Sequence, residues 1–255
     1  MAEYETIRRA GASIRTAEID AGLRAHMNKV YGLMSVAMVV TGIVAFLVGA
    51  DLSAALSGQP TRFLSYGVLE TLFNSPVRYV IMFAPLAMVF FLGSAISRMS
   101  QSKAQMFFYL FAGLMGLSIS WIFAVYTGYS IAQTFFVTAI AFAGLSLWGY
   151  TTKKDISGWG SFLIMGVIGL IITSIVNIWL QSEAIMFAVS ALGVLIFAGL
   201  TAYDTQNIKN TYLQVRTQPN GEALAQKYAI FGALRLYLDF INLFMFLLHF
   251  MGGRN

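Results

Sequence analysis

Residues 229–250 read AIFGALRLYLDFINLFMFLLHF, an apolar run that nonetheless contains Arg235 and Asp239. At 1.5 Å per residue, a helix of this length rises about 33 Å, enough to cross a hydrocarbon core of about 30 Å. A second carboxylate, Asp204, closes the apolar run before it. A charged side chain in a membrane helix costs about 2.5–3.5 kcal/mol on insertion scales, so by default it indicates a functional site.

The rest of the chain has the composition of a membrane protein. Of its 255 residues, 58% are hydrophobic and 11% are charged, against about 25% charged in an ordinary soluble domain. The apolar residues gather into runs of about 20, whereas a β-barrel needs alternating segments of about 10. The sequence therefore predicts an all-α membrane protein that crosses the bilayer several times.

Seven membrane spans are predicted, and the connections between most of them are short enough to make neighbouring spans antiparallel. Their approximate ranges are 30–50, 78–97, 106–126, 131–150, 160–180, 185–208 and 229–250. The longer connection from Asp51 to Val77 is rich in apolar residues, which predicts either a short interfacial helix or an external loop over the bundle mouth. Residues 1–28 are polar and lack the features of a signal peptide, which predicts a cytoplasmic tail before a membrane domain at 29–255.

The positions of Lys and Arg predict a cytoplasmic N-terminus, because cytoplasmic segments of membrane proteins carry an excess of these residues. With the N-terminus inside, twelve fall in inside segments and three outside; the inside set is Arg8, Arg9, Arg15, Arg24, Lys29, Arg98, Lys103, Lys153, Lys154, Lys209, Arg216 and Lys227. The net charge of +5 could also indicate a nucleic-acid partner. Its concentration before the first span favours the lipid bilayer as partner and argues against nucleic acid. With no cysteine and two histidines, a zinc site is not expected.

Polar residues of the last two spans fall on one face of each helix. On the last span these residues and one aromatic ring follow helical spacing: Arg235, Asp239, Asn242, Phe246 and His249. On the span before it, a similar face carries Thr201, Asp204, Thr205 and Ile208, with Asn207 close by. Such stripes should point into the bundle, since facing lipid is costly. The two can meet if the last helix begins below the membrane surface, near Glu222, after the turn Pro219-Asn220-Gly221.

Two carboxyl groups in close contact have a distinctive chemistry. They cannot both be ionised without a large penalty, so they titrate as a unit. A shared proton would join the two helices at one pH, and its loss would push them apart. The doubly ionised pair offers oxygen ligands suited to Ca²⁺. The residues alone leave two alternatives: a pH-gated cation path, or a structural arrangement in which Arg235 holds Asp239 while Asn207 and water hold Asp204.

Two segments of the chain resemble the signature segments of the Bax inhibitor family, the transmembrane Bax-inhibitor-motif proteins. They are AYDTQNI at residues 202–208 and ALRLYLDFINLF at residues 233–244. The resemblance implies a seven-helix bundle with one central helix, and a pH-sensitive calcium leak gated by two aspartates that match Asp204 and Asp239. It also implies a location in a bacterial inner membrane, because bacterial members have this short form.

The chain departs from the family pattern in the second predicted span. Several members carry an acidic residue where this chain reads FAPLAM at residues 83–88, so an acid that contributes to the pore is absent there. Arg98, at the end of that span, is a candidate basic latch to Asp204. The predicted site has Asp204 and Asp239 as pH sensor, gate and Ca²⁺ ligands, with Ca²⁺ as transported ion and no resident cofactor; its supporting polar residues are Arg235, Asn207, Asn242 and Arg98.

Two other functions remain open at this point. The protein could be a regulatory membrane protein that binds a quality-control protease or a stress-response partner through its N-terminal tail. It could also be an intramembrane aspartyl protease, which needs two aspartates on adjacent spans, and Tyr203-Asp204 resembles one half of the presenilin signature. The other half, Gly-x-Gly-Asp, is absent, because Leu236-Tyr237-Leu238 precedes Asp239. We therefore expect no enzymatic activity.

Overall fold

The computed structural model describes the backbone of residues 2–95 and 99–254 and the side chains of residues 19–91 and 99–254. In chain order its helices are α1 (Ala2–Leu56), α2 (Tyr66–Phe73), α3 (Val77–Ala95), α4 (Gln101–Ile119), α5 (Ile122–Val125), α6 (Gly128–Thr151), α7 (Trp159–Leu180), α8 (Glu183–Val215) and α9 (Gly221–Met251). Within these ranges, β structure is limited to an isolated bridge between Tyr126 and Arg254. The all-α prediction is confirmed.

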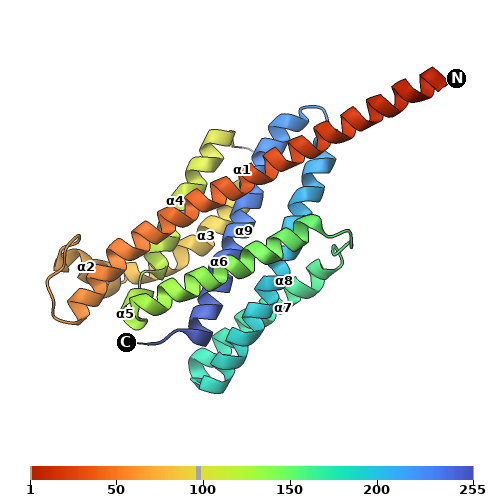
Figure 1. The fold of residues 1–255 in the computed structure, drawn as a ribbon. Coiled ribbons are helices and arrows are strands. Elements are labelled where there is room, and N and C mark those ends of the chain that lie inside the picture. The colour runs from red at the N-terminus through yellow and green to blue at the C-terminus, as the bar shows by residue number, and fades with distance from the viewer. Residues whose placement is uncertain (1, 96–98, 255) are drawn as a thin grey trace.

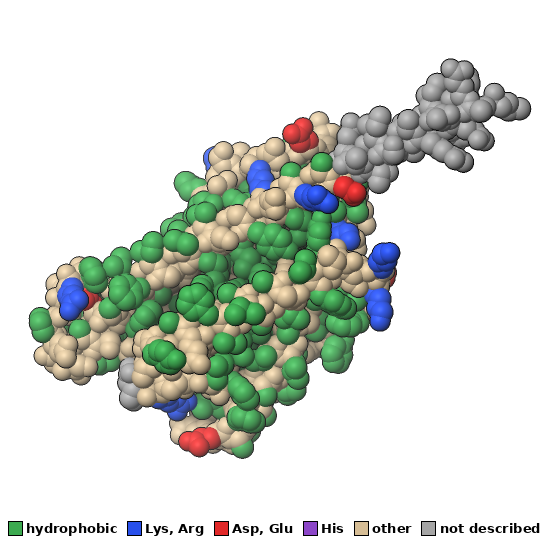
Figure 2. Space-filling view, viewed as in Figure 1, with side chains coloured by type: hydrophobic (Ala, Val, Ile, Leu, Met, Phe, Trp, Pro, Cys, Tyr) green, Lys and Arg blue, Asp and Glu red, His purple; other side chains and the backbone are tan. Residues whose placement is uncertain are grey.

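The helices have the length and surface of membrane spans. Six of them in the described chain are long and apolar enough to cross a bilayer, and α2 with α3, a pair bent by 63°, would make a seventh. Figure 2 shows hydrophobic side chains spread over the flanks of the bundle and charged side chains mostly near its ends. Figure 1 places the two termini at opposite ends, as an odd number of spans requires. The count of seven and the cytoplasmic N-terminus stay predictions.

Several helices differ from the predicted spans in their bounds. Helix α1 begins at Ala2, so no helix boundary separates residues 1–28 from the first span. The predicted span 106–126 is divided into α4 and α5, and the break lies at Ser120, whose backbone carbonyl packs against Gly49 of α1. Between Asp51 and Val77 the short helix α2 is formed, in agreement with the helical alternative. Helix α3 runs through Pro85.

Helix α9 is the central element of the bundle. It packs against α1, α4, α6 and α8, whereas α3 packs mainly on α4 and α7 mainly on α8 (Figure 1). The Tyr237 side chain of α9 is fully buried, and its hydroxyl lies 2.7 Å from Oγ1 of Thr41 on α1. Thr41 in turn donates to the carbonyl of Ala112 on α4 at 2.9 Å. These contacts confirm the central helix that the family resemblance implied.

Small residues allow the helices around α9 to approach closely. A Cβ atom on Gly149 of α6 would collide with the backbone carbonyl of Ala202 on α8, and one on Gly116 of α4 would collide with that of Thr41 on α1. Such close backbone contacts replace the hydrophobic effect, which does not operate between helices in lipid. The contact at Gly149 matters for the site, because it fixes α8 two residues before Asp204.

We expect Gly149→Leu to lower the stability of the bundle by about 1–3 kcal/mol, as overpacking typically does, because it forces α6 away from α8. Thermal unfolding of the purified protein in detergent measures this effect. Gly144→Leu on the same helix is the matched control, since its new side chain would start in open space. Equal unfolding temperatures for the two variants would contradict the close α6–α8 contact.

Candidate functional site

The contact between the two predicted stripes depends on how far α8 and α9 extend. Both continue well past the predicted ends at residues 208 and 229, and they meet in a short turn after Val215. Asn220 adopts a left-handed conformation with φ of 62° just before α9 begins at Gly221. The turn expected at Pro219-Asn220-Gly221 is confirmed. The early start of α9 brings Arg235 and Asp239 to the level of Asp204.

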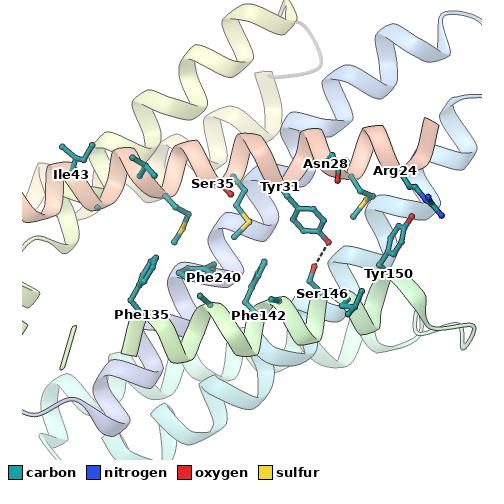
Figure 3. A pocket seen from close by; sticks show the side chains of 18 residues that line it. Arg24, Asn28, Tyr31, Ser35, Ile43, Phe135, Phe142, Ser146, Tyr150 and Phe240 are labelled. Carbon is teal, nitrogen blue, oxygen red and sulfur yellow. Dashed lines mark hydrogen bonds between the residues drawn. The ribbon is translucent and has the colours of Figure 1, made fainter. Parts of the chain in front are cut away.

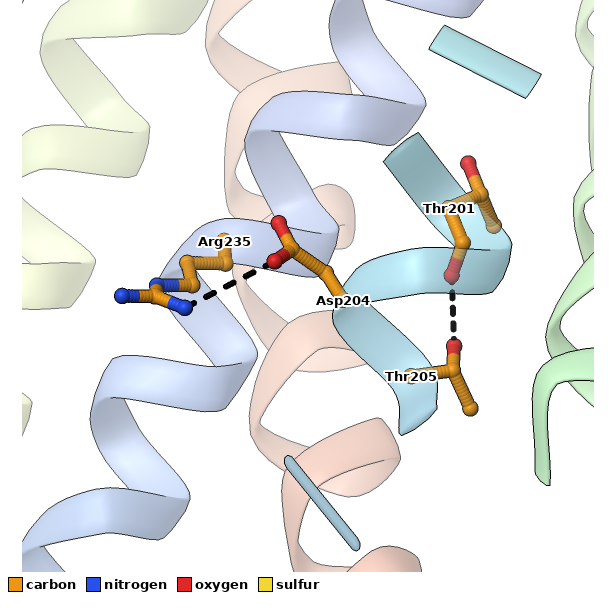
Figure 4. Close-up of polar contacts among 4 residues, drawn as sticks. All are labelled: Thr201, Asp204, Thr205 and Arg235. Carbon is orange, nitrogen blue, oxygen red and sulfur yellow. Dashed lines mark hydrogen bonds and ion pairs between the residues drawn. The ribbon is translucent and has the colours of Figure 1, made fainter. Parts of the chain in front are cut away.

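Asp204, Arg235 and Asp239 form one cluster between α8 and α9, in which the two carboxyl groups are buried and the Arg235 side chain is about half exposed. Nη1 of Arg235 lies 3.5 Å from Oδ1 of Asp204, and Figure 4 shows the two side chains directed at each other. The Asp204 and Asp239 side chains are within hydrogen-bond range of one another. Asp204 is 9% exposed and Asp239 is 4% exposed. A hydrogen bond between two carboxyl groups requires a proton on one of them, so this contact is a site for a shared proton.

The burial of Asp239 is not fully compensated by hydrogen bonds. Its Oδ2 atom is among the buried polar atoms of the described side chains that have no hydrogen-bond partner. A buried acceptor in this condition costs about 1–3 kcal/mol, more if it is charged. Such a cost favours the protonated carboxyl group or a bound cation at this position.

The four polar residues predicted to support the aspartate pair do not all contact it. Arg235 forms its ion pair with Asp204 and not, as the structural alternative had it, with Asp239. Asn207 and Arg235 line a cavity of about 370 Å³ between α8 and α9. Nδ2 of Asn242 donates to the carbonyl of Leu238 on its own helix at 2.8 Å. Arg98 lies outside the described residues, so its proposed latch to Asp204 stays a prediction.

A calcium ion at this site would depend on the carboxyl pair alone for charged ligands. In the described part of the chain, no three His, Cys, Asp or Glu side chains come together as metal ligands. Calcium takes six to eight oxygen ligands, so water or backbone carbonyls would supply most of them. This arrangement suits a passing ion better than a permanently bound one.

Comparison with known proteins agrees with the two segments that the sequence analysis singled out. A family model described as "Inhibitor of apoptosis-promoting Bax1" matches residues 23–255. The chain belongs to the Bax inhibitor-1 family. The inner membrane protein YbhL of Escherichia coli K12 is 46% identical over 235 residues, which cover 92% of this chain and 94% of YbhL.

Other relatives are equally extensive matches. An uncharacterized protein of Caulobacter vibrioides is 45% identical over 240 residues, covering 92% of this chain and 91% of that protein. Protein RP147 of Rickettsia prowazekii is 40% identical over 235 residues, covering 92% of each chain. Together with the apolar helices, the similarity to YbhL places the protein in a bacterial inner membrane as a multi-pass protein.

In the first signature segment, residues 202–208, three consecutive side chains contact three different parts of the structure. Asp204 contacts α9, as described above. The Thr205 hydroxyl donates to the carbonyl of Thr201 at 2.7 Å (Figure 4) and lies 2.9 Å from Oγ of Ser146 on α6. The Gln206 side chain accepts from the backbone N–H of Ile156 at 2.9 Å and donates to the carbonyl of Lys154 at 2.8 Å. The segment therefore fixes α8 against α9, α6 and the α6–α7 connection.

The sequence analysis did not identify two hydroxyl groups that are linked to Thr205 by hydrogen bonds, those of Ser146 and Tyr31. The hydroxyl of Tyr31 on α1 lies 2.6 Å from Oγ of Ser146 (Figure 3). Because Thr205 uses its own hydrogen on Thr201, Ser146 donates to Thr205 and Tyr31 donates to Ser146. A signal existed, since a hydroxyl inside an apolar span needs a partner, but the sequence does not say which one.

The sequence analysis also placed Asp51 wrongly, at the start of the connection that follows the first span. It lies in α1 with 1% of its surface exposed, and its carboxylate accepts from three backbone N–H groups, those of Arg62, Phe63 and Leu64, at 2.8, 2.7 and 2.6 Å. Charge-assisted bonds of this kind are about twice as strong as neutral ones. Asp51 therefore anchors the α1–α2 connection and takes no part in the Asp204 cluster.

We expect Arg235→Gln to destabilise the bundle more at pH 8 than at pH 6. The variant leaves two buried carboxyl groups facing each other, and they repel once the shared proton is lost. Because the Arg235 side chain is 51% exposed, the loss should be about 1 kcal/mol, the upper end for solvent-screened pairs. Thermal unfolding at the two pH values measures it.

Two further variants make this prediction specific to charge. Arg235→Lys keeps the cation and should unfold nearly as wild type does. Adding Asp204→Asn to Arg235→Gln removes the repulsion and should abolish the extra loss at pH 8. An Arg235→Gln loss that is equal at both pH values would mean that the guanidinium does not balance the pair.

Proposed function

We propose that this protein is a pH-gated leak for cations, Ca²⁺ in particular, and that the proton shared by Asp204 and Asp239 controls it. The observation that carries the proposal is the meeting of two carboxyl groups from different membrane helices in a buried position. Ionisable groups inside the membrane are expensive, and they mark ion pathways and proton relays. The function is not enzymatic in this proposal, and it requires no resident cofactor.

The gating step follows from the charges at the pair. With one shared proton, the pair and Arg235 carry little net charge, and α8 and α9 are held together. Loss of that proton leaves two negative charges in a medium of low dielectric, where their repulsion is much stronger than in water. A divalent cation can then take the place of the proton between the carboxylates. We therefore expect the leak to increase as the pH rises.

Two cavities lie where a cation path through the carboxyl pair would begin and end. The cavity of about 370 Å³ at Asn207 and Arg235 lies toward the α8–α9 turn. A second cavity, of about 260 Å³, lies at the opposite ends of the same helices; its polar lining consists of Ser174, Asn177, Ser190 and His249. The carboxyl pair lies between these two levels of α8 and α9. The two cavities would give a cation polar surroundings before and after the pair.

An apolar cluster separates the pair from the second cavity. The Phe246 ring stacks on that of Phe197 with centroids 5.7 Å apart and lies directly against Gly193. Leu243, which is 1% exposed, packs in the same cluster. A hydrophobic constriction stops ions by excluding water. In this proposal the structure represents the closed state, and Phe246 is its constriction.

The decisive test is Ca²⁺ flux into liposomes that contain the purified protein, measured from pH 6 to pH 8. Wild type should show flux that increases with pH. Asp204→Asn and Asp239→Asn each remove one ionisable partner, so each should flatten the pH dependence. Asp155→Asn is the matched control, because Asp155 is exposed in the α6–α7 connection and should leave the profile unchanged.

Two outcomes would refute the leak proposal. One is the absence of flux at any pH from protein that unfolds cooperatively with heat. The other is an unchanged pH profile in both variants at the pair. Regulation of a quality-control protease or another stress-response partner would then be the next function to test, by capture with full-length protein and with protein lacking residues 1–28. Cleavage of a membrane substrate that either variant abolishes would instead indicate a protease.

We also expect Phe246→Ala to raise the Ca²⁺ flux at pH 6, where the wild-type path is closed, because the smaller side chain admits water to the constriction. Phe246→Leu should have a smaller effect in the same direction. Phe162→Ala is the control, since that ring is 71% exposed on α7. The liposome assay measures all three, and a Phe246→Ala flux equal to that of Phe162→Ala would place the constriction elsewhere.

A further inference from the structure

A long groove lies between α1 and α6, and its lining does not include Asp204, Arg235 or Asp239. Both helices pack on α9, and between them they leave a cavity of about 870 Å³ whose floor includes Phe240 of α9 (Figure 3). Its walls are mostly apolar; they include Met34 and Met38 on α1 and Phe135 and Phe142 on α6. Figure 2 shows the hydrophobic side chains in this hollow.

The groove is long as well as wide. From Arg24 to Ile43 it follows α1 for about 28 Å at 1.5 Å per residue. A second cavity, of about 390 Å³, shares Met38, Gly42, Phe135 and Phe240 with it and continues toward α5. One leaflet of a bilayer, head groups included, is about 21 Å thick, half of the usual 40–45 Å. The groove is therefore long enough for a whole phospholipid molecule.

The polarity of the lining changes along the groove in the same order as in a phospholipid. Arg24, Asn28 and Tyr150 lie at one end, and the lining toward Ile43 and Phe135 is apolar (Figure 3). Arg24 is exposed, and it has no ion pair with any acidic side chain that the structure describes, Asp20 included. The Tyr31 hydroxyl is already bonded to Ser146, so the donors for a phosphate at this end are the side chains of Arg24, Asn28 and Tyr150.

The membrane environment decides what fills this space. Away from its polar end, the groove opens on a surface of α1 and α6 that exposes large apolar residues, among them Val39, Ile43, Phe136 and Leu147. In the hydrocarbon core there is little water to occupy an apolar groove, so hydrocarbon occupies it. Its cationic end selects an anionic head group, since each basic residue near the membrane surface contributes about 1 kcal/mol of attraction to anionic lipid.

We propose that this groove is a binding site for one anionic phospholipid, with its phosphate at Arg24 and an acyl chain between α1 and α6. The site is independent of the proposed leak, because none of Asp204, Arg235 and Asp239 lines it. The ligand class is a glycerophospholipid with a negatively charged head group, taken from the leaflet in which Arg24 lies.

Native mass spectrometry of the purified protein tests the site, with phosphatidylglycerol and phosphatidylcholine of identical chains as probes. Wild type should retain one phosphatidylglycerol per chain and prefer it over phosphatidylcholine. Gly42→Leu should reduce retention of both lipids about tenfold, which corresponds to about 1.4 kcal/mol, because its new side chain would grow into the open groove. Arg24→Gln should remove the preference for phosphatidylglycerol and leave binding of the chains.

Controls distinguish the groove from the general lipid surface. Gly144→Leu introduces the same side chain at an open position of α6 outside the groove lining, and it should bind as wild type does. Ala143→Leu fills the groove from the opposite wall, so it repeats the Gly42→Leu test should that variant fold poorly.

Three results would overturn the proposal. Equal lipid retention in wild type, Gly42→Leu and Ala143→Leu would mean that the lipid binds elsewhere on the surface. Equal wild-type retention of the two lipids would mean that Arg24 does not select the head group. A dimer without lipid that both groove-filling variants dissociate would show that a second copy of the chain occupies the groove.

Discussion

The compensation of charge between Asp204, Arg235 and Asp239 is the constraint on which the rest of the bundle depends. Charged groups in a low-dielectric interior are tolerated only with partners, and these partners come from two different helices. A shift of α9 by one residue would turn its side chains by about 100° and separate Arg235 from Asp204. The axial register of α8 and α9 is therefore fixed at this point, and the short turn at Asn220 is compatible with it.

The geometry of a helix explains why the signature segment around Asp204 has several polar residues in succession. Consecutive side chains point about 100° apart at 3.6 residues per turn. Asp204, Thr205 and Gln206 therefore face three directions, and each finds a different partner: α9, α6 and the α6–α7 connection. A segment of this kind does more than carry an acid, because it also holds that acid in position from three sides.

The central position of α9 has a second consequence, in the space between α1 and α6. A central helix can serve as a common floor for α1 and α6 while these two stay apart, and the space between them becomes a groove. On α9, Asp239 of the charged pair and Phe240 of the groove floor are consecutive, so their side chains point about 100° apart. Ion passage and lipid binding, as proposed, would use separate surfaces of the same helix.

The sequence by itself determined the helical membrane fold and the turn before α9, and it permitted the meeting of Asp204 with Asp239, because apolar run lengths and helical spacing fix the level and face of a residue on its own helix. Only the tertiary structure decided that Arg235 pairs with Asp204 across the helices rather than with Asp239 four residues away. It also decided the Tyr31–Ser146 contact and the groove between α1 and α6. These depend on how helices rotate and cross relative to one another, and the spacing of residues within one helix carries no information about that.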